Sequence, residues 1–134
     1  MANFAAYLEQ ALLGATLLGS TYTSPATVYV SLATTIASDG DFFTEVTTNV
    51  GYARQPVQFS EPTSGPNYTC VNSADVTFSA ATSVWGTVVA FGIYDSATIG
   101  GGNQLYWGTL GTSQAIATGS TVQILAGNLT VRLD

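Results

Sequence analysis

The sequence predicts an all-β protein, a compact β-sandwich of jelly-roll-like form with about eight strands and one N-terminal α-helix. Apolar residues recur at helical spacing only near the N-terminus. From residue 27 onward, short stretches alternate apolar and polar residues, and glycine-containing turns separate them at near-regular intervals. Because 134 residues is the usual length of one domain, we expect residues 1–134 to form a single β-sandwich domain.

Segment 3–18 is predicted to be the helix. Its apolar residues recur at steps of three and four: Phe4, Leu8, Ala11, Leu12, Ala15 and Leu18. Asn3 is a suitable N-cap, and Gly19 is suited to end the helix. The opposite side carries Tyr7, Leu13 and Leu17, so the helix needs cover on more than one side. Either the chain's own sheet and loops or another subunit can supply that cover.

Segment 27–133 is predicted to hold the strands. They are Thr27–Ala33, Gly51–Phe59, Asp75–Ser79, Gly86–Tyr94, Asn103–Leu110, Ser113–Ile116, Thr121–Leu125 and Asn128–Leu133. Pro56 lacks a ladder donor, which confines its strand to a sheet edge or a bulge. The polar segments Thr34–Asn49 and Glu61–Asn72 are predicted to be loops.

Ionic side chains are scarce. Only 7% of the residues are charged, the net charge is −6, and Arg54 and Arg132 are the only basic side chains. Two cations are too few to neutralise a phosphate backbone, so we expect no nucleic-acid binding. The acidic balance also disfavours anionic membranes. The N-terminal segment lacks a basic signal-peptide region, and we expect synthesis in a host cytoplasm.

The composition excludes most catalytic sites. Histidine and lysine are absent, which rules out Ser-His-Asp and Cys-His arrangements. Nothing in the sequence brings two carboxylates to catalytic separation, so we predict no catalytic residues and no cofactor. Asp39, Asp41 and Glu45 loosely resemble an oxygen-ligand calcium loop, although Asp-Gly is more often a simple turn, and we predict no metal site. Cys70 stands alone and is expected to be partly buried.

Two further sets of residues have competing interpretations. The aromatic residues of the predicted strands would either form a sugar-binding face or pack in the core: Trp85, Phe91, Tyr94, Tyr106 and Trp107. Core packing is the commoner role of such residues. Arg54 lies in the edge-like strand and would pair with an acid either across a subunit boundary or within its own chain.

Several motifs recur in a familiar order. They are Tyr29–Leu32 after an apolar helix, Gly51–Gln55, Val76–Phe78 leading to Trp85–Val88, Phe91–Asp95 and Ala126–Val131. In this order the chain resembles a family of small tailed-bacteriophage virion proteins, described as tail-fibre-like or as head decoration (cement) proteins. The resemblance covers the chain from about Phe4 to Leu133.

The resemblance implies a jelly-roll-like sandwich that assembles as a homotrimer and has no enzymatic role. We therefore expect a capsid cement protein on the virion's capsid surface, which binds the major capsid protein and stabilises the head. A tail or tail-fibre component is the alternative, and a carbohydrate-binding adhesion module is a third. The residues expected at oligomer or capsid contacts are Phe4, Leu8, Leu12, Tyr52, Arg54 and Pro56.

Overall fold

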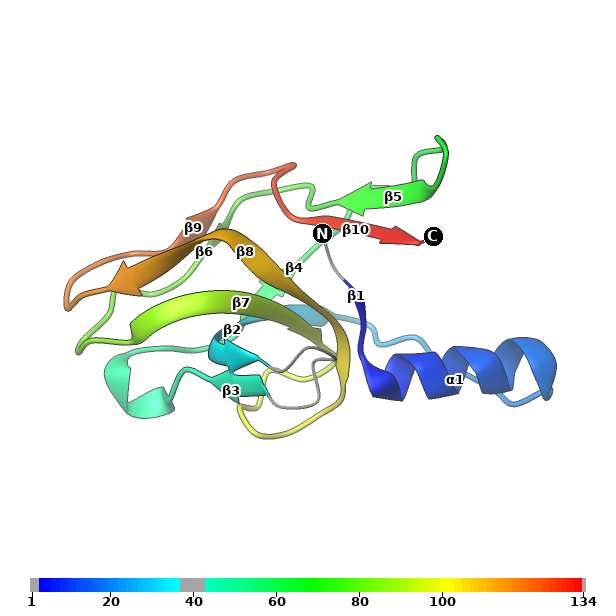
Figure 1. Ribbon diagram of the computed structural model, residues 1–134, viewed down its shortest axis with the longest axis horizontal. Coiled ribbons are helices and arrows are strands. Elements are labelled where there is room, and N and C mark those ends of the chain that lie inside the picture. The colour runs from blue at the N-terminus through cyan, green and yellow to red at the C-terminus, as the bar shows by residue number, and fades with distance from the viewer. Residues whose placement is uncertain (1–2, 37–42, 134) are drawn as a thin grey trace.

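The larger layer of the molecule is a six-stranded antiparallel sheet (Figure 1). The computed structural model describes residues 3–36 and 43–133. The sheet runs in the order β1 (Asn3–Phe4), β8 (Gln104–Ile116), β7 (Gly86–Tyr94), β2 (Val28–Ile36) and β3 (Phe43–Glu45), with β4 (Gln55–Val57) also paired to β2. Because β7 occupies one edge of β2, β3 and β4 share the other edge, each along a different part of it.

Two short antiparallel ribbons form the second layer. One pairs β5 (Tyr68–Val71) with β10 (Thr130–Leu133), and the other pairs β6 (Val76–Thr77) with β9 (Gln123–Ile124). Both ribbons lie over the same side of the large sheet in Figure 1. The described chain is therefore a sandwich-like all-β protein with one N-terminal helix, as predicted, with ten strands where about eight were expected.

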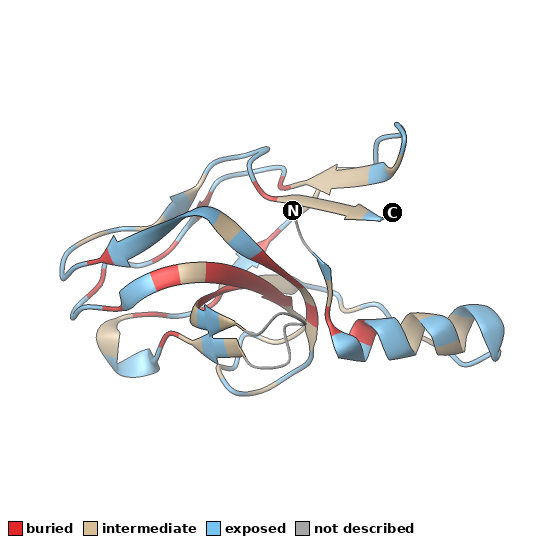
Figure 2. Ribbon diagram, in the orientation of Figure 1, coloured by how far each residue is buried: buried red, intermediate tan, exposed pale blue. Residues whose placement is uncertain are grey.

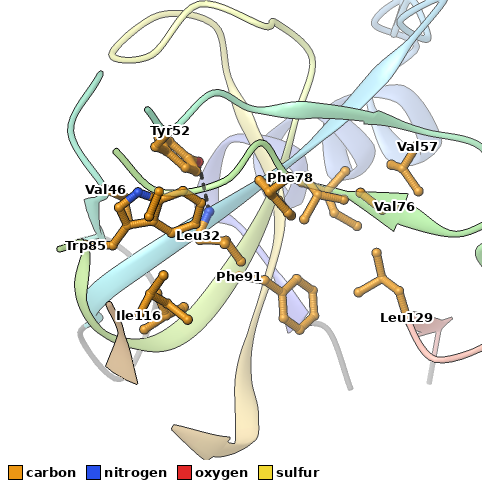
Figure 3. Close-up of a cluster of buried hydrophobic side chains, with 14 residues drawn as sticks. Leu32, Val46, Tyr52, Val57, Val76, Phe78, Trp85, Phe91, Ile116 and Leu129 are labelled. Carbon is orange, nitrogen blue, oxygen red and sulfur yellow. Dashed lines mark hydrogen bonds between the residues drawn. The ribbon is translucent and has the colours of Figure 1, made fainter. Parts of the chain in front are cut away.

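The core fills the space between the layers. Figure 3 shows its aromatic centre, where the Tyr52 ring stacks on Phe78 at 6.0 Å and meets the edge of Trp85 at 5.4 Å. Leu32 from β2 and Ile116 from β8 pack into the same buried cluster. Edge-to-face contacts of this kind contribute stability beyond the apolar area that they bury.

Strand predictions were most accurate where local pattern and pairing agree. Gly86–Tyr94 is a strand with those bounds, and the predicted strand at Thr27–Ala33 exists but continues to Ile36. Gly51–Phe59 shortens to Gln55–Val57, and Pro56 lies on the edge strand β4, opposite Tyr29. An edge tolerates proline because no neighbour needs its missing N–H.

Three predictions about loops and turns were wrong. The segment 34–49 was expected to be a loop, yet it holds the end of β2, β3 and a 3₁₀ turn at Thr48–Val50. Its β-branched Thr34, Thr35 and Ile36 favour strand although the threonines are polar. The segment 61–72 contains β5, which pairs with the distant β10.

The third error concerns the glycine-containing turn, Gly111-Thr112, that was expected between the predicted strands Asn103–Leu110 and Ser113–Ile116. β8 runs through both residues without turning. Ala90 pairs with Thr109 and Val88 with Gln114, so residues 110–113 lie opposite Val89 alone. Extra residues on one strand form a bulge, which bends the strand without ending it.

The helix α1 (Ala6–Leu17) projects from the sheet at the end where β1 joins β8 (Figure 1). Asn3 belongs to β1 and not to a cap; the N-cap is Ala5, whose side chain makes no capping bond. Gly19 follows the C-cap Leu18 with φ +72°, as expected for the glycine that ends a helix.

Candidate functional site

The outer half of the helix α1 carries exposed residues, drawn in pale blue away from the sheet in Figure 2, and several of them are large and apolar. Leu8 in its first turns is its buried residue. Beyond it, Leu13 is 58% exposed and Leu17 is 73% exposed, and the C-cap Leu18 is 82% exposed. Aliphatic side chains this exposed and this close together are typical of an interaction surface.

The base of the helix is fixed to the sheet. The Trp107 indole Nε1 donates to the Phe4 carbonyl oxygen at 3.1 Å, and the Ala5 amide donates to the Leu105 carbonyl oxygen at 2.9 Å. The Phe4 ring packs on Tyr106 with their centroids 5.5 Å apart. These contacts hold the start of α1 firmly while its outer half extends from the domain.

Arg54 lies inside the protein. Its Nε donates to Glu45 Oε2 and its Nη2 to Glu45 Oε1, both at 2.8 Å. Its Nη1 donates to the carbonyl oxygens of Ser96 and Gly101 at 2.8 and 3.0 Å, in the loop between β7 and β8. The guanidinium also lies 3.7 Å from the centroid of the Tyr94 ring. A planar fork with five donors suits this combination of partners better than lysine does.

Tyr52 completes the network. Its hydroxyl donates to Glu45 Oε2 at 2.7 Å and accepts the Leu32 amide hydrogen at 2.9 Å. Burial raises the pKa of Tyr52, and the neighbouring Glu45 carboxylate raises it further. The phenol therefore stays protonated, and the network joins β2, β3 and the loop that carries Arg54.

The six residues predicted at interfaces fall into two groups. Leu8, Tyr52 and Arg54 are buried in their own chain, which disfavours direct contact of their side chains with a partner. For Arg54 the acid lies within the chain, which was the competing interpretation, although the pair is buried and not at the surface. Phe4 and Leu12 are half-buried and Pro56 is exposed, and contacts of these residues with a partner stay a prediction.

The helix face predicted to make contacts with a partner, which carries Leu8 and Leu12, is thus the face turned toward the chain's own sheet. The sequence did hold a signal for the outward surface, because Leu13 and Leu17 stand on the side opposite Leu8 and Leu12. Amphipathic spacing alone could not tell which of two apolar sides meets the sheet. The docking of Leu8 against the domain decides it.

The aromatic residues considered for a sugar platform serve the interior. Trp85, Phe91 and Trp107 are buried, and Tyr94 and Tyr106 are half-buried. The Trp85 Nε1 donates to the Val50 carbonyl oxygen at 2.8 Å. The burial of three of these five rings favours the core interpretation.

The acidic residues considered for a calcium loop are only partly described. Asp39 and Asp41 lie outside the described residues, whereas Glu45 is bound by Arg54 and Tyr52. Among residues 3–36 and 43–133, no three histidine, cysteine or acidic side chains gather as a metal site would require. Cys70 is half-buried on β5, as expected for a lone cysteine. No helix in the same ranges combines the length and apolar character needed to cross a membrane.

Comparison with known proteins gives one family. A search of curated proteins finds no match. The model of the family described as podophage GP4 fiber I protein gp80 matches residues 3–132, from β1 to the last strand β10. The match therefore covers both the projecting helix and the sandwich behind it. The chain belongs to the podophage GP4 fiber I protein gp80 family, a family of phage virion structural proteins.

Proposed function

We propose that the protein is a non-enzymatic structural subunit of the phage virion that assembles as a homotrimer within the fibre apparatus. The observation that carries the proposal is the match of residues 3–132 to a fibre family. The chemistry of the chain supports it, since histidine and lysine are absent and Arg54 is held in a buried ion pair. Such a chain acts through the surfaces that it covers.

The physical mechanism is association of preformed surfaces. A subunit that binds only the assembled virion stabilises the assembled state by mass action. Three linked subunits add avidity, because after the first contact each further contact is intramolecular. The exposed leucines of α1 supply apolar surface for such contacts. Only 7% of the residues are charged, so few ionic groups would have to be desolvated when surfaces associate.

The second candidate is decoration of the capsid, in which the trimer clamps the major capsid protein. The shape of the described residues favours it, because they form a two-layer body with one projecting helix and no elongated shaft (Figure 1). In this role the protein would strengthen the head against the pressure of packaged DNA.

Labelling of intact virions separates the two candidates. Gold-labelled antibodies against the purified protein are expected at the tail, and label over the head would instead favour capsid decoration. Virions without label at either place would contradict both proposals. Sedimentation of the purified protein tests the oligomer, and a single chain at high concentration would contradict the homotrimer.

A further inference from the structure

An apolar cleft opens between the β5–β10 ribbon and the large sheet. Its volume is about 190 Å³. The sheet side is formed by Val28, Ile93, Leu105 and Tyr106, and the ribbon side by Cys70 and Val131. Ile93 and Leu105 form a buried floor, whereas the other four side chains are only half-buried. The sandwich is therefore incompletely filled at this end.

The apolar surface continues outward along the ribbon. Val131 pairs with Cys70, and Leu133 pairs with Tyr68. Since side chains alternate along a strand, Tyr68 and Leu133 share the ribbon face of Cys70 and Val131. Tyr68 is 60% exposed and Leu133 is 48% exposed, so this face extends from the cleft into solvent.

The same chain carries an exposed aliphatic surface on the outer half of α1. Leu13 and Leu17 are one helical turn apart, and Leu18 follows as the C-cap; we call these three exposed leucines the ridge. Their exposures of 58%, 73% and 82% leave a large part of each side chain open to solvent. An apolar cavity of about 150 Å³ is large enough to take up benzene, so the cleft can admit the end of a leucine side chain.

We propose that the outer half of α1 docks in the β5–β10 cleft of a second copy of this chain. Both surfaces are apolar, because exposed leucines form the ridge and apolar side chains and Cys70 line the cleft. The inference rests on the proposed self-assembly, and it names the contact that would hold the copies together.

The symmetry of this contact sets the assembly. A helix that enters a neighbour's cleft makes a head-to-tail contact, which either closes into a ring or continues as a filament. In a closed ring of three, each subunit gives one helix and receives one. An α1 of 12 residues is roughly 18 Å long, and a stable interface buries about 800 Å² on each partner. In such a ring every subunit takes part in two contacts, once through its helix and once through its cleft.

Cys70 makes the contact directly measurable, because it is the only cysteine of the chain and lies in the cleft. Leu13→Cys, Leu17→Cys and Leu18→Cys each place a second thiol on the exposed ridge. Under copper-phenanthroline oxidation in air, we expect at least one of these variants to give disulfide-linked dimers and trimers on non-reducing gels. The linked species should disappear when Cys70→Ser is added.

A matched control is the substitution Val84→Cys, because Val84 is 62% exposed. Val84 precedes β7, and the first residues of β7 lie at the end of the sheet remote from α1 (Figure 1). It should give no product that depends on Cys70. Independently, Leu17→Asp should raise the alkylation rate of Cys70 in the assembled protein at least tenfold, and Val84→Asp should leave that rate unchanged.

The outcomes separate this contact from the proposed function. Crosslinks that persist with Cys70→Ser would mean that helices pack on one another, and would overturn the proposal. A trimer by sedimentation with no crosslink at any ridge position and no change in Cys70 alkylation would also overturn it while leaving the homotrimer intact. A protein that stays monomeric would remove the homotrimer and this contact together.

Discussion

The guanidinium of Arg54 and the carboxylate of Glu45 form a two-pronged ion pair, with both N–O distances at 2.8 Å, inside a protein that has only ten charged residues. Their side chains are 1% and 10% exposed. The pair fastens the loop between β7 and β8 to β3, since Arg54 also binds the carbonyl oxygens of Ser96 and Gly101.

Removal of one partner of this ion pair should strongly destabilise the folded protein. Arg54→Met leaves the Glu45 carboxylate without its cation, and we expect the free energy of unfolding to fall by about 3–5 kcal/mol. Urea denaturation of the variant and the parent protein measures this loss in the free energy of unfolding. Glu61→Gln, at an exposed position, is the control and should change stability by less than about 0.5 kcal/mol. The double variant Arg54→Met with Glu45→Gln should recover part of the loss, and no recovery would show that packing against Tyr94 matters more than charge.

The hydroxyl of Tyr52 should contribute measurably on its own. Tyr52→Phe removes the bond to Glu45 and leaves the Leu32 amide without its acceptor. Leaving a buried donor unsatisfied costs about 1–3 kcal/mol, which is the expected loss in urea denaturation. Tyr68→Phe provides the comparison, because Tyr68 is 60% exposed and its loss should be near zero. Equal losses in the two variants would argue against the network.

Stability should decline in alkaline solution. Burial raises the pKa of Tyr52 above the ordinary value of 10.0, and burial likewise raises the pKa values of Tyr94 and Tyr106. Above about pH 10 the unfolded chain releases these protons while the folded chain keeps them, so the free energy of unfolding falls as pH rises. Denaturation at pH 8 to 11.5 should show this decline, and Tyr52→Phe should make the slope shallower. A flat profile would contradict the assignment.

Gly51 should be less tolerant of a side chain than another glycine with the same backbone angle. Gly51 has φ +83° and Gly119 has φ +86°. A Cβ on Gly51 would lie 3.0 Å from the Ala80 carbonyl oxygen, whereas one on Gly119 would meet nothing within 4 Å. Gly119→Ala should therefore cost about 1–2 kcal/mol from backbone strain, and Gly51→Ala more than that. Thermal or urea unfolding of both variants measures the two losses in stability. A larger loss for Gly119→Ala than for Gly51→Ala would contradict the prediction.

Leu8 should anchor the helix to the sandwich. It is 3% exposed, and Leu8→Ala is expected to lower the free energy of unfolding by about 2–5 kcal/mol. Leu125→Ala offers the same chemical change at a residue that is 50% exposed, and its effect should stay below about 0.5 kcal/mol. If α1 docks independently of the domain, Leu8→Ala will instead leave global unfolding unchanged.

Local pattern decided much of the fold. The apolar run with β-branched and aromatic residues in Gly86–Tyr94 was enough to place a central strand, and the helical spacing of Leu8 and Leu12 was enough to place the helix. Pattern failed where pairing is distant. β5 pairs with β10, which follows some sixty residues later. Tyr68, Thr69 and Val71 favour strand locally, but the preceding Pro62, Gly65 and Pro66 favoured a loop, and only the distant partner decides between the two.

The candidate site divides in the same manner. The composition, with no histidine and no lysine, excluded sites that depend on those two side chains, since folding cannot supply missing side chains. Tertiary structure alone decided which surfaces are available. It turned Leu8, Tyr52 and Arg54 inward and left Leu13 and Leu17 outward, because burial depends on where the helix and loops meet the sheet and not on the order of residues along the chain.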